Sequence, residues 1–307
     1  MVRRAPAKGD DTMQYRAFGN TGLKVSEVGL GAGNIGYVSQ AQAEQVLNMA
    51  IDMGVTLIDT AASYLDSEAR IGKYLSHRKE EFVIATKCGT YETFVDGERQ
   101  TRADYTPDGV LRTIDGSRGR LKTDVLDIVQ FHHLPADREV WKGAFEALLE
   151  AKSRGWTRFV GVSEDGQAAM DAATQWPLDS EEFTYNVFVQ DPAADLMPLL
   201  RERKMGTIIK GPIAHGIYKR ADRPEGVGAR KIWDRARQSQ FKDLVADSGM
   251  PLVEFILRFT LSNPDVCTAI VGTTRPDHLQ ANVRVSDGGK LPDEICERAK
   301  RLFERTD

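Results

Sequence analysis

The stretch Thr56-Leu-Ile-Asp-Thr-Ala-Ala-Ser-Tyr64 predicts a short buried strand that ends in a carboxylate, Asp59. A phenol, Tyr64, follows after two small alanines. Two apolar runs downstream also end in polar groups, since Phe82–Lys87 ends in an amine and Asp127–His132 ends in an imidazole. Three successive strand ends thus carry a carboxylate, followed closely by a phenol, then an amine, and then an imidazole. We interpret these four groups as one site.

Composition limits the class of protein. The chain has 307 residues, is 41% hydrophobic and carries a net charge of −4 with acids and bases mixed. Neither a basic stripe for nucleic acid nor a polybasic cluster for a membrane surface is present, and no apolar run is long enough to span a membrane. The three cysteines are scattered and odd in number, which favours a reducing cytoplasm over a disulfide frame or a structural zinc site.

Apolar runs alternate with helical patterns eight times. The runs are Val28–Gly31, Thr56–Asp59, Phe82–Thr86, Asp127–Phe131, Arg158–Val162, Phe183–Asn186, Thr207–Lys210 and Thr268–Val271. The helical patterns lie near 40–53, 67–76, 107–120, 138–154, 166–175, 195–203, 250–262 and from Pro276 onward. Ahead of them, Gln14–Phe18 and Leu23–Ser26 flank a Gly/Asn turn and predict a hairpin.

Eight strand–helix units predict an α/β fold, a (β/α)₈ TIM barrel with an N-terminal β-hairpin. The runs are short and apolar on both faces, as strands of a covered parallel sheet are. We expect a single domain over residues 13–307, preceded by a tail at residues 1–12. A doubly wound sheet is the rival. Glycines follow the first run, but no acidic residue stands at the expected place, so unit count favours the barrel.

The four groups at the strand ends fit together chemically as one set. Taken singly, each has an ordinary structural role, such as a helix cap, a packed aromatic, an ion pair or a core imidazole. A lysine buried at a barrel mouth needs a partner, and Asp59 is the nearest in the pattern. A cation beside Tyr64 lowers the phenol pKa, which predicts a proton donor near neutral pH. His132 can donate a hydrogen bond to the same substrate oxygen.

A metal site is the alternative for the His132-His133 pair. Adjacent side chains on a strand point to opposite faces, so at most one of the two is expected to face inward. No His-x-His occurs in the chain. We therefore predict no metal.

The sequence resembles the aldo-keto reductase family over about residues 14–285. Thr56–Glu68 resembles the family's Asp-Thr-Ala-x-x-Tyr-Gly-x-Ser-Glu signature, and Ile84–Lys87 matches its lysine strand. Ser117–His132 resembles its helix leading into the histidine strand, and Arg158–Ser163 and Tyr185-Asn186 follow at the family spacing. The resemblance implies that Tyr64 is the general acid, that Lys87 and Asp59 tune it, and that His132 orients a substrate carbonyl.

The resemblance also implies a nicotinamide cofactor across the barrel mouth. The implied contacts are Gly31, Ala32, Gly33, Asp59, Ser163, Glu164, Glu182, Tyr185, Lys210, Gly211, Pro212, Gly272, Thr273, Thr274, Arg275, His278 and Asn282. Glu164 and Glu182 stand where the family has an asparagine and a glutamine that contact the carboxamide. Lys210 stands where an aromatic residue commonly stacks on the ring, and Leu65 replaces a glycine.

The segment after the eighth run predicts the cofactor preference. Pro276 suits the first turn of a helix, whose free N–H groups bind anions. Thr273 and Thr274 add hydroxyls, and Arg275 can grip a phosphate with two hydrogen bonds, although Asp277 adds a negative charge. We predict NADP(H) over NAD(H) by about tenfold. The alternative is that Arg275 points to solvent and that both cofactors are used.

Three functions remain open at this point. The favoured one is an NAD(P)-dependent oxidoreductase that acts on aldehydes, ketones, alcohols or sugars. A cofactor-binding regulatory subunit of the same fold is the alternative, and an unrelated barrel enzyme such as an isomerase is the third. Candidate substrate-wall residues are Tyr91, Phe94, His133, Tyr218 and Trp233.

Overall fold

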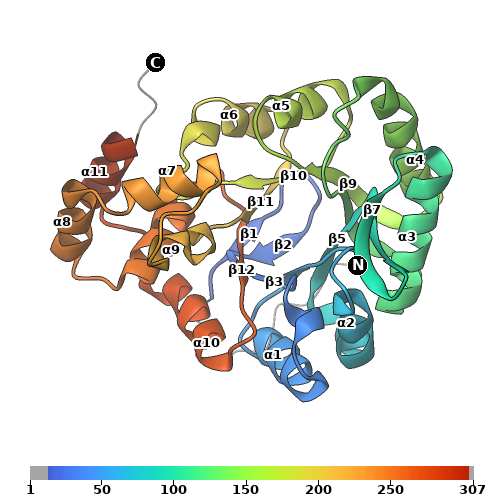
Figure 1. The fold of residues 1–307 in the computed structure, drawn as a ribbon, viewed down its shortest axis with the longest axis horizontal. Coiled ribbons are helices and arrows are strands. Elements are labelled where there is room, and N and C mark those ends of the chain that lie inside the picture. The colour runs from blue at the N-terminus through green and yellow to red at the C-terminus, as the bar shows by residue number, and fades with distance from the viewer. Residues whose placement is uncertain (1–12, 304–307) are drawn as a thin grey trace.

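Eight parallel strands close into a barrel in chain order, with helices outside it (Figure 1). The predicted (β/α)₈ TIM barrel is therefore confirmed. The computed structural model describes residues 13–303, so the predicted tail at residues 1–12 lies outside the described part. The barrel strands are β3 (Val28–Gly31), β4 (Leu57–Asp59), β5 (Val83–Cys88), β8 (Leu126–Phe131), β9 (Thr157–Ser163), β10 (Ser180–Thr184), β11 (Gly206–Lys210) and β12 (Thr268–Gly272).

Helices form the outer layer. They are α1 (Gln40–Asp52), α2 (Ser67–Leu75), α3 (Pro107–Leu121), α4 (Trp141–Ser153), α5 (Gly166–Gln175), α6 (Leu196–Glu202), α7 (Val227–Arg235), α8 (Ser239–Ser248), α9 (Leu252–Ser262), α10 (Pro276–Arg284) and α11 (Asp293–Phe303). Short 3-10 turns are η1 (Ile35–Tyr37), η2 (Ser76–Glu81), η3 (Arg138–Val140), η4 (Asp191–Ala193), η5 (Ala214–Lys219) and η6 (Val285–Gly288). None of the helices between residues 13 and 303 is long and apolar enough to cross a membrane.

The predicted N-terminal hairpin is confirmed and closes one end of the barrel. Its strands are β1 (Tyr15–Ala17) and β2 (Lys24–Ser26), which pair antiparallel. Phe18, Leu23 and Val25 of the hairpin segment pack in one cluster with apolar side chains of the barrel interior. Burial of these side chains supplies hydrophobic stabilisation at the end of the barrel opposite to the strand ends that carry polar groups.

Side chains alternate between the inside and the outside of the barrel along each strand, and this places the polar groups inside. Leu57 and Val83 belong to the interior cluster, whereas Ile58 packs in the larger core outside the barrel. Interior positions recur every second residue, so Asp59 follows Leu57 and Lys87 lies four residues beyond Val83. The interior is thus apolar at its base and polar at the carboxyl ends of the strands.

The sixth strand begins three residues earlier than predicted. The apolar run suggested Phe183–Asn186, but β10 covers Ser180–Thr184 and pairs with β9 and β11. Its first three residues are polar and buried, since Ser180, Glu181 and Glu182 are each at most 2% exposed. Hydrophobicity alone misses such a strand. The fourth helix also begins later than predicted, at Trp141, after η3.

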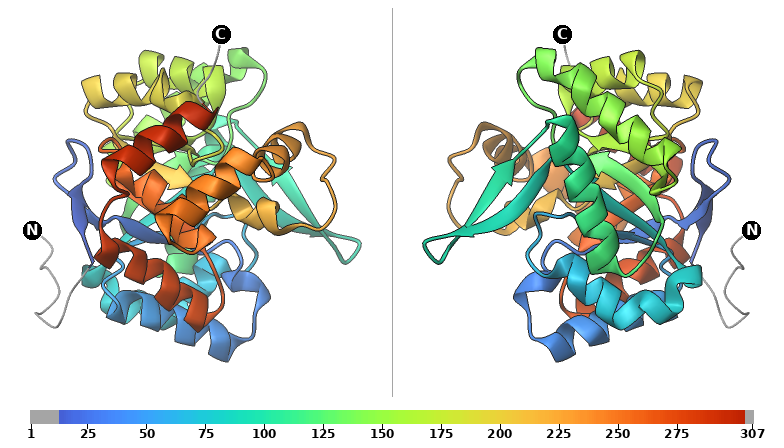
Figure 2. Two further views of the ribbon diagram at one scale, coloured as in Figure 1. Left: turned by 90° about the vertical axis from the view of Figure 1, so that its left-hand side faces the viewer. Right: turned by 90° about the vertical axis from the view of Figure 1, so that its right-hand side faces the viewer.

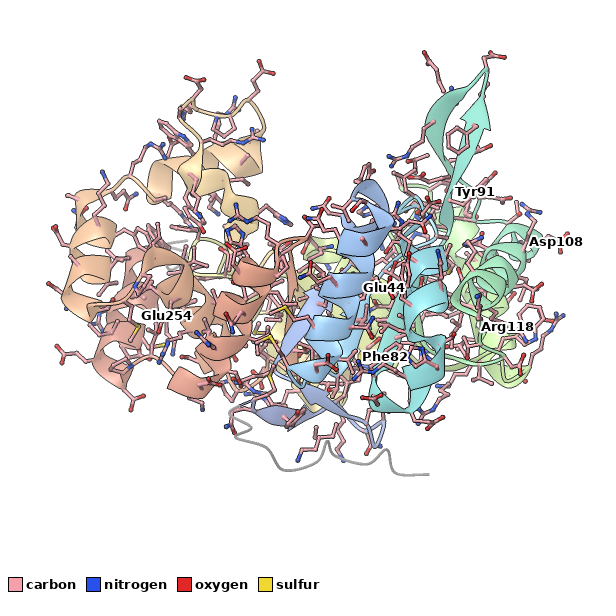
Figure 3. The ribbon with its side chains drawn as sticks, turned by 90° about the horizontal axis from the view of Figure 1, so that it is seen from below. Glu44, Phe82, Tyr91, Asp108, Arg118 and Glu254 are labelled. Atoms are coloured by element: carbon pink, nitrogen blue, oxygen red, sulfur yellow. The ribbon has the colours of Figure 1, made fainter. Side chains whose placement is uncertain are left out.

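A second hairpin was not predicted. β6 (Thr90–Val95) and β7 (Glu98–Ala103) pair antiparallel and project from the body of the molecule (Figure 2). Asp96 and Gly97 form its turn with φ of 53° and 81°, and Asp-Gly is a recognised signal for such a turn. In Figure 3, Tyr91 lies near the base of this hairpin, and Phe82, which directly precedes β5, lies lower. The polar stretch after β11 contains α7 and α8, which were also missed, as was α11.

Candidate active site

A cavity of about 670 Å³ opens at the carboxyl ends of the barrel strands. Several residues predicted for the site line it, namely Gly31, Gly33, Asp59, Tyr64, His132, Ser163, Glu182, Lys210, Gly211, Pro212 and Gly272. Asn34, His133, Asp165, His215 and Gly216 also line it. The fold therefore gathers side chains from most of the barrel strands around one space.

Lys87 lies buried beside this cavity and is 1% exposed. Its Nζ donates a short hydrogen bond to Asp59 Oδ1 and a second, of 3.2 Å, to the carbonyl oxygen of Thr60. Glu182 Oε2 lies 3.2 Å from the same Nζ. The predicted lysine–aspartate partnership is present, and the second carboxylate was not predicted.

Tyr64 and His132 meet above this ion pair. The Tyr64 hydroxyl lies 3.2 Å from His132 Nε2, and the two rings pack edge to face with centroids 5.2 Å apart. Lys87 Nζ lies 5.6 Å from the centroid of the Tyr64 ring. The structure thus brings together the four side chains that the sequence placed at three separate strand ends.

The pKa of Tyr64 differs from the prediction. Burial is the main cause that raises the pKa of this phenol to about 12; Lys87 acts to lower the pKa, and the nearby Asp59 and Glu182 act to raise it. The expectation that the cation dominates was wrong because desolvation penalises the phenolate and two carboxylates offset one ammonium. Tyr64 therefore holds its proton throughout the neutral range and is a weaker acid than predicted.

His132 is a neutral imidazole in this environment. Burial lowers its pKa to about 2, and the charge of Lys87 acts in the same direction. Ser63 Oγ lies 2.9 Å and Thr90 Oγ1 lies 3.0 Å from Nδ1. Sequence reasoning missed both hydroxyls, although Ser63 directly precedes Tyr64 and Thr90 begins the strand after β5.

The two adjacent histidines both face the cavity. Their rings stack with centroids 4.9 Å apart and planes 9° from parallel. The prediction that at most one faces inward was wrong because β8 ends at Phe131, so strand alternation does not govern His132 and His133. Within residues 13–303, no three histidine, cysteine or acidic side chains are grouped to hold a metal ion.

Glu164 and Lys210 have partners within the protein. Glu164 Oε2 accepts a hydrogen bond of 2.8 Å from the N–H of Leu134, and Oε1 accepts one of 3.0 Å from the N–H of Asp165. Glu164 therefore holds the loop after β8 and does not line the cavity. Lys210 Nζ lies 3.3 Å from Ser163 Oγ and 3.4 Å from Asp165 Oδ2 at the cavity wall.

Two other predicted cofactor contacts lie outside the cavity. Tyr185 follows the end of β10 and is 2% exposed, with its ring against Phe259 and its hydroxyl accepting a hydrogen bond from Asn263. Its side chain therefore faces the helix layer. Ala32 is fully buried, and its N–H donates to the carbonyl oxygen of Asp59, which ties the loop after β3 to β4.

The start of α10 holds the remaining predicted contacts. Thr273 Oγ1 accepts a hydrogen bond of 3.1 Å from the N–H of Arg275. Arg275 makes two hydrogen bonds to Asp277, of 3.1 and 2.7 Å, and both side chains are 62% exposed. The arginine fork that was predicted to grip a phosphate is thus already engaged by a carboxylate. Thr274, His278 and Asn282 lie on the same segment, outside the cavity.

The predicted substrate-wall residues have mixed positions. His133 lines the cavity, whereas Phe94 is 67% exposed on the β6–β7 hairpin. Tyr218 is buried, and Trp233 Nε1 donates to the carbonyl oxygen of Arg220. Figure 3 shows this hairpin and the segment of η5 and α7 rising on two sides above the barrel.

Comparison with known proteins agrees with this architecture. The model of the aldo/keto reductase family matches residues 27–304. The chain belongs to the aldo/keto reductase family. L-galactose dehydrogenase of Arabidopsis thaliana is 28% identical, with 88% of this chain and 87% of the relative covered. D-threo-aldose 1-dehydrogenase of a Pseudomonas species is 26% identical over 85% of this aldo/keto reductase and 89% of the relative. The holo form of an aldo-keto reductase from Bacillus halodurans superposes with a TM-score of 0.81 at 26% identity, covering 94% and 96% of the two chains.

Proposed function

We propose that this aldo/keto reductase interconverts a small carbonyl compound and the corresponding alcohol with NAD(P)(H), and that Tyr64 is its general acid and base. The observation that carries the proposal is the 3.2 Å approach of the Tyr64 hydroxyl to His132 Nε2 at the cavity wall. Two donors converge there on the place of one substrate oxygen. That arrangement suits proton transfer to an alkoxide as it forms.

Each side chain then has a distinct task. Tyr64 gives its proton to the substrate oxygen in reduction and takes it back in oxidation. His132 is neutral, so only one of its ring nitrogens carries a hydrogen. If Ser63 or Thr90 donates a hydrogen bond to Nδ1, that hydrogen is on Nε2, which can donate to the same substrate oxygen. Lys87 lowers the cost of the phenolate that exists while the proton is away.

The cavity fits a nicotinamide cofactor. Glycines line it where β3 and β12 end, and a Cβ added to Gly31 would approach the backbone nitrogen of Gly272 to 3.4 Å. Glu182 Oε2 is buried without an aligned hydrogen-bond donor, so it can accept from a carboxamide N–H. We expect Ser163 and the Lys210–Pro212 turn to bind the same group. The bound cofactor would supply or accept the hydride.

We expect NADP(H) to be preferred over NAD(H), but modestly. The threonines and the helix start after β12 suit the extra phosphate. The Arg275 guanidinium already binds Asp277 through two hydrogen bonds and lowers the pKa of that carboxyl to about 2, so it is not free for a phosphate. The three cysteines are free and not paired with one another, which suits a reducing cytoplasm.

The substrate class is proposed from the cavity and the relatives. Asn34, His133, Asp165 and His215 give the wall many hydrogen-bonding groups, which suit a hydroxylated substrate. Two relatives are named as dehydrogenases of L-galactose and of D-threo-aldoses. We therefore favour a sugar or a sugar-like hydroxyaldehyde.

The test is turnover followed by nicotinamide absorbance. Purified protein is assayed with NADPH and NADH against aromatic and short hydroxyaldehydes, and with the oxidised cofactors against a panel of aldoses. We expect turnover that Tyr64→Phe abolishes. Tight cofactor binding without turnover on any substrate would instead favour the regulatory-subunit alternative.

A further inference from the structure

Lys87 faces two carboxylates, and only one of them is expected from the sequence pattern. Asp59 on β4 and Glu182 on β10 both contact its Nζ, although these strands are not neighbours in the barrel. All three side chains are almost fully buried, at most 3% exposed. One ammonium balances one carboxylate, so the trio carries a charge of −1 if both acids are ionised. A buried net charge of this kind is costly, and the acids can avoid it by keeping one proton between them.

The surrounding groups do not supply a second cation to balance the trio. Burial and then the charge of Glu182 raise the pKa of Asp59 well above its usual value, while the two carboxylates help keep Lys87 protonated. Tyr64 and His132 are both neutral near pH 7. The trio's own proton therefore decides the charge at this place.

Groups on the neighbouring strands are accounted for in the same way. Lys210 on β11, the strand next to β10, is engaged by Ser163 and Asp165. Glu181 precedes Glu182 on β10 and points to the helix layer, and burial raises its pKa well above the usual value, so it too tends to be neutral. Asp59 is thus the acid with a raised pKa that faces the cavity from this side.

Both carboxylates line the space that the proposed function assigns to nicotinamide. The oxidised ring carries a positive charge that the reduced ring lacks. We propose that Asp59 and Glu182 share one proton around Lys87 and release it to solvent when the oxidised cofactor binds, so that Glu182 makes the protein select the oxidised over the reduced form. The proposal rests on the proposed function for the site of the ring. The step breaks one carboxyl O–H bond and passes its proton to water or buffer.

A consequence follows for the direction of the reaction. If binding of NAD(P)⁺ releases a proton, the affinity of the protein for NAD(P)⁺ rises with pH, whereas its affinity for NAD(P)H does not. A glutamine in place of Glu182 would leave Lys87 paired with Asp59 alone, with no proton to release and no additional negative charge. Glu182 therefore biases this aldo/keto reductase toward oxidation of an alcohol.

The experiment measures proton release and affinity without turnover. NADP⁺ and NADPH are titrated into the protein near pH 7 by calorimetry in buffers of different ionisation enthalpy. We expect the wild type to release up to one proton with NADP⁺ and none with NADPH. Glu182→Gln should release none, and its preference for the oxidised form should fall by about tenfold or more, the direction that a lost nearby charge requires.

Two variants identify the source of the proton. Glu181→Gln is the matched control, because it removes the neighbouring buried carboxyl on the helix side, and it should retain the wild-type release and preference. Tyr64→Phe should also retain the release, and its loss there would assign the proton to the phenol and overturn the proposal. Equal release from the wild type and Glu182→Gln, or none from either, would also overturn it. Failure of the wild type to bind either cofactor form would contradict the proposed function as well.

Discussion

The ion pairs at the floor of the cavity and at the start of α10 differ in their exposure to solvent. Lys87 with Asp59 and Glu182 has side chains at most 3% exposed, whereas Arg275 and Asp277 are each 62% exposed. Removing one member of a buried pair leaves an uncompensated charge, while an exposed pair is weak and screened by salt. We therefore expect turnover to be sensitive to single substitutions at the floor, and cofactor preference to depend on small, salt-dependent differences at the rim.

The largest effect is expected from Tyr64→Phe. The phenol proton is needed only as the alkoxide forms, so its loss acts on the transition state and leaves cofactor affinity unchanged. We expect kcat to fall by at least about 10²-fold, the scale of general acid catalysis. Tyr15→Phe, at the other end of the barrel, is the control and should retain activity. A Tyr64→Phe enzyme with near wild-type kcat would remove Tyr64 from the role of acid.

Lys87→Met should inactivate the enzyme and also destabilise it, by about 3–5 kcal/mol, since the buried acidic side chains Asp59 and Glu182 lose their cation. The Asp59 carboxyl, whose pKa burial already raises, would then lose the cation that favours its ionised form. The loss of unfolding free energy in Lys87→Met, relative to the wild type, should be smallest below the ordinary carboxyl pKa of about 4 and should grow as pH rises. Urea unfolding at acidic and neutral pH measures this. Lys142→Met, whose side chain is 80% exposed, is the control. An active and stable Lys87→Met protein would contradict the comparison at its buried end.

The pH dependence should follow the raised pKa of Tyr64, about 12 in this structure. Oxidation uses the phenolate, so kcat/KM for an alcohol should rise with pH through the alkaline range, by up to about tenfold per pH unit. Reduction uses the phenol and should not decline until pH approaches that pKa. Because the pKa of His132 is lowered to about 2, neither profile should show its titration between pH 5 and 8. An oxidation rate that is flat above pH 8 would contradict this assignment.

The smallest effects are expected at the rim. Asp277→Asn frees Arg275 and should raise the preference for NADP(H) several-fold at low salt, and Arg275→Ala should lower it by a similar factor. Both changes should shrink as salt is added. The measurement is kcat/KM for each cofactor at two salt concentrations. A large, salt-independent effect of either substitution would show that the exposed pair behaves like the buried one, and the contrast between the two regions would fail.

Much of the cavity floor could be predicted from sequence because strand periodicity is local. Asp59, Lys87 and His132 each follow an apolar run, and parallel strands bring such ends to one edge of the barrel. Prediction was weaker where position depends on loops or on polar strands. The displaced start of β10 and the outward side chain of Tyr185 are of this kind, because hydrophobicity does not reveal a strand that begins with three buried polar residues.

The sequence by itself determined the order of eight strand–helix units, the hairpin that precedes them and the four side chains at the strand ends, since these depend on periodicity and on neighbours along the chain. Only the tertiary structure decided how strongly those groups act. It brings Glu182 across the barrel to Lys87, buries Tyr64 deeply enough to raise its pKa, and pairs Arg275 with Asp277. Desolvation and through-space distance set each of these effects, and neither can be read from the order of residues.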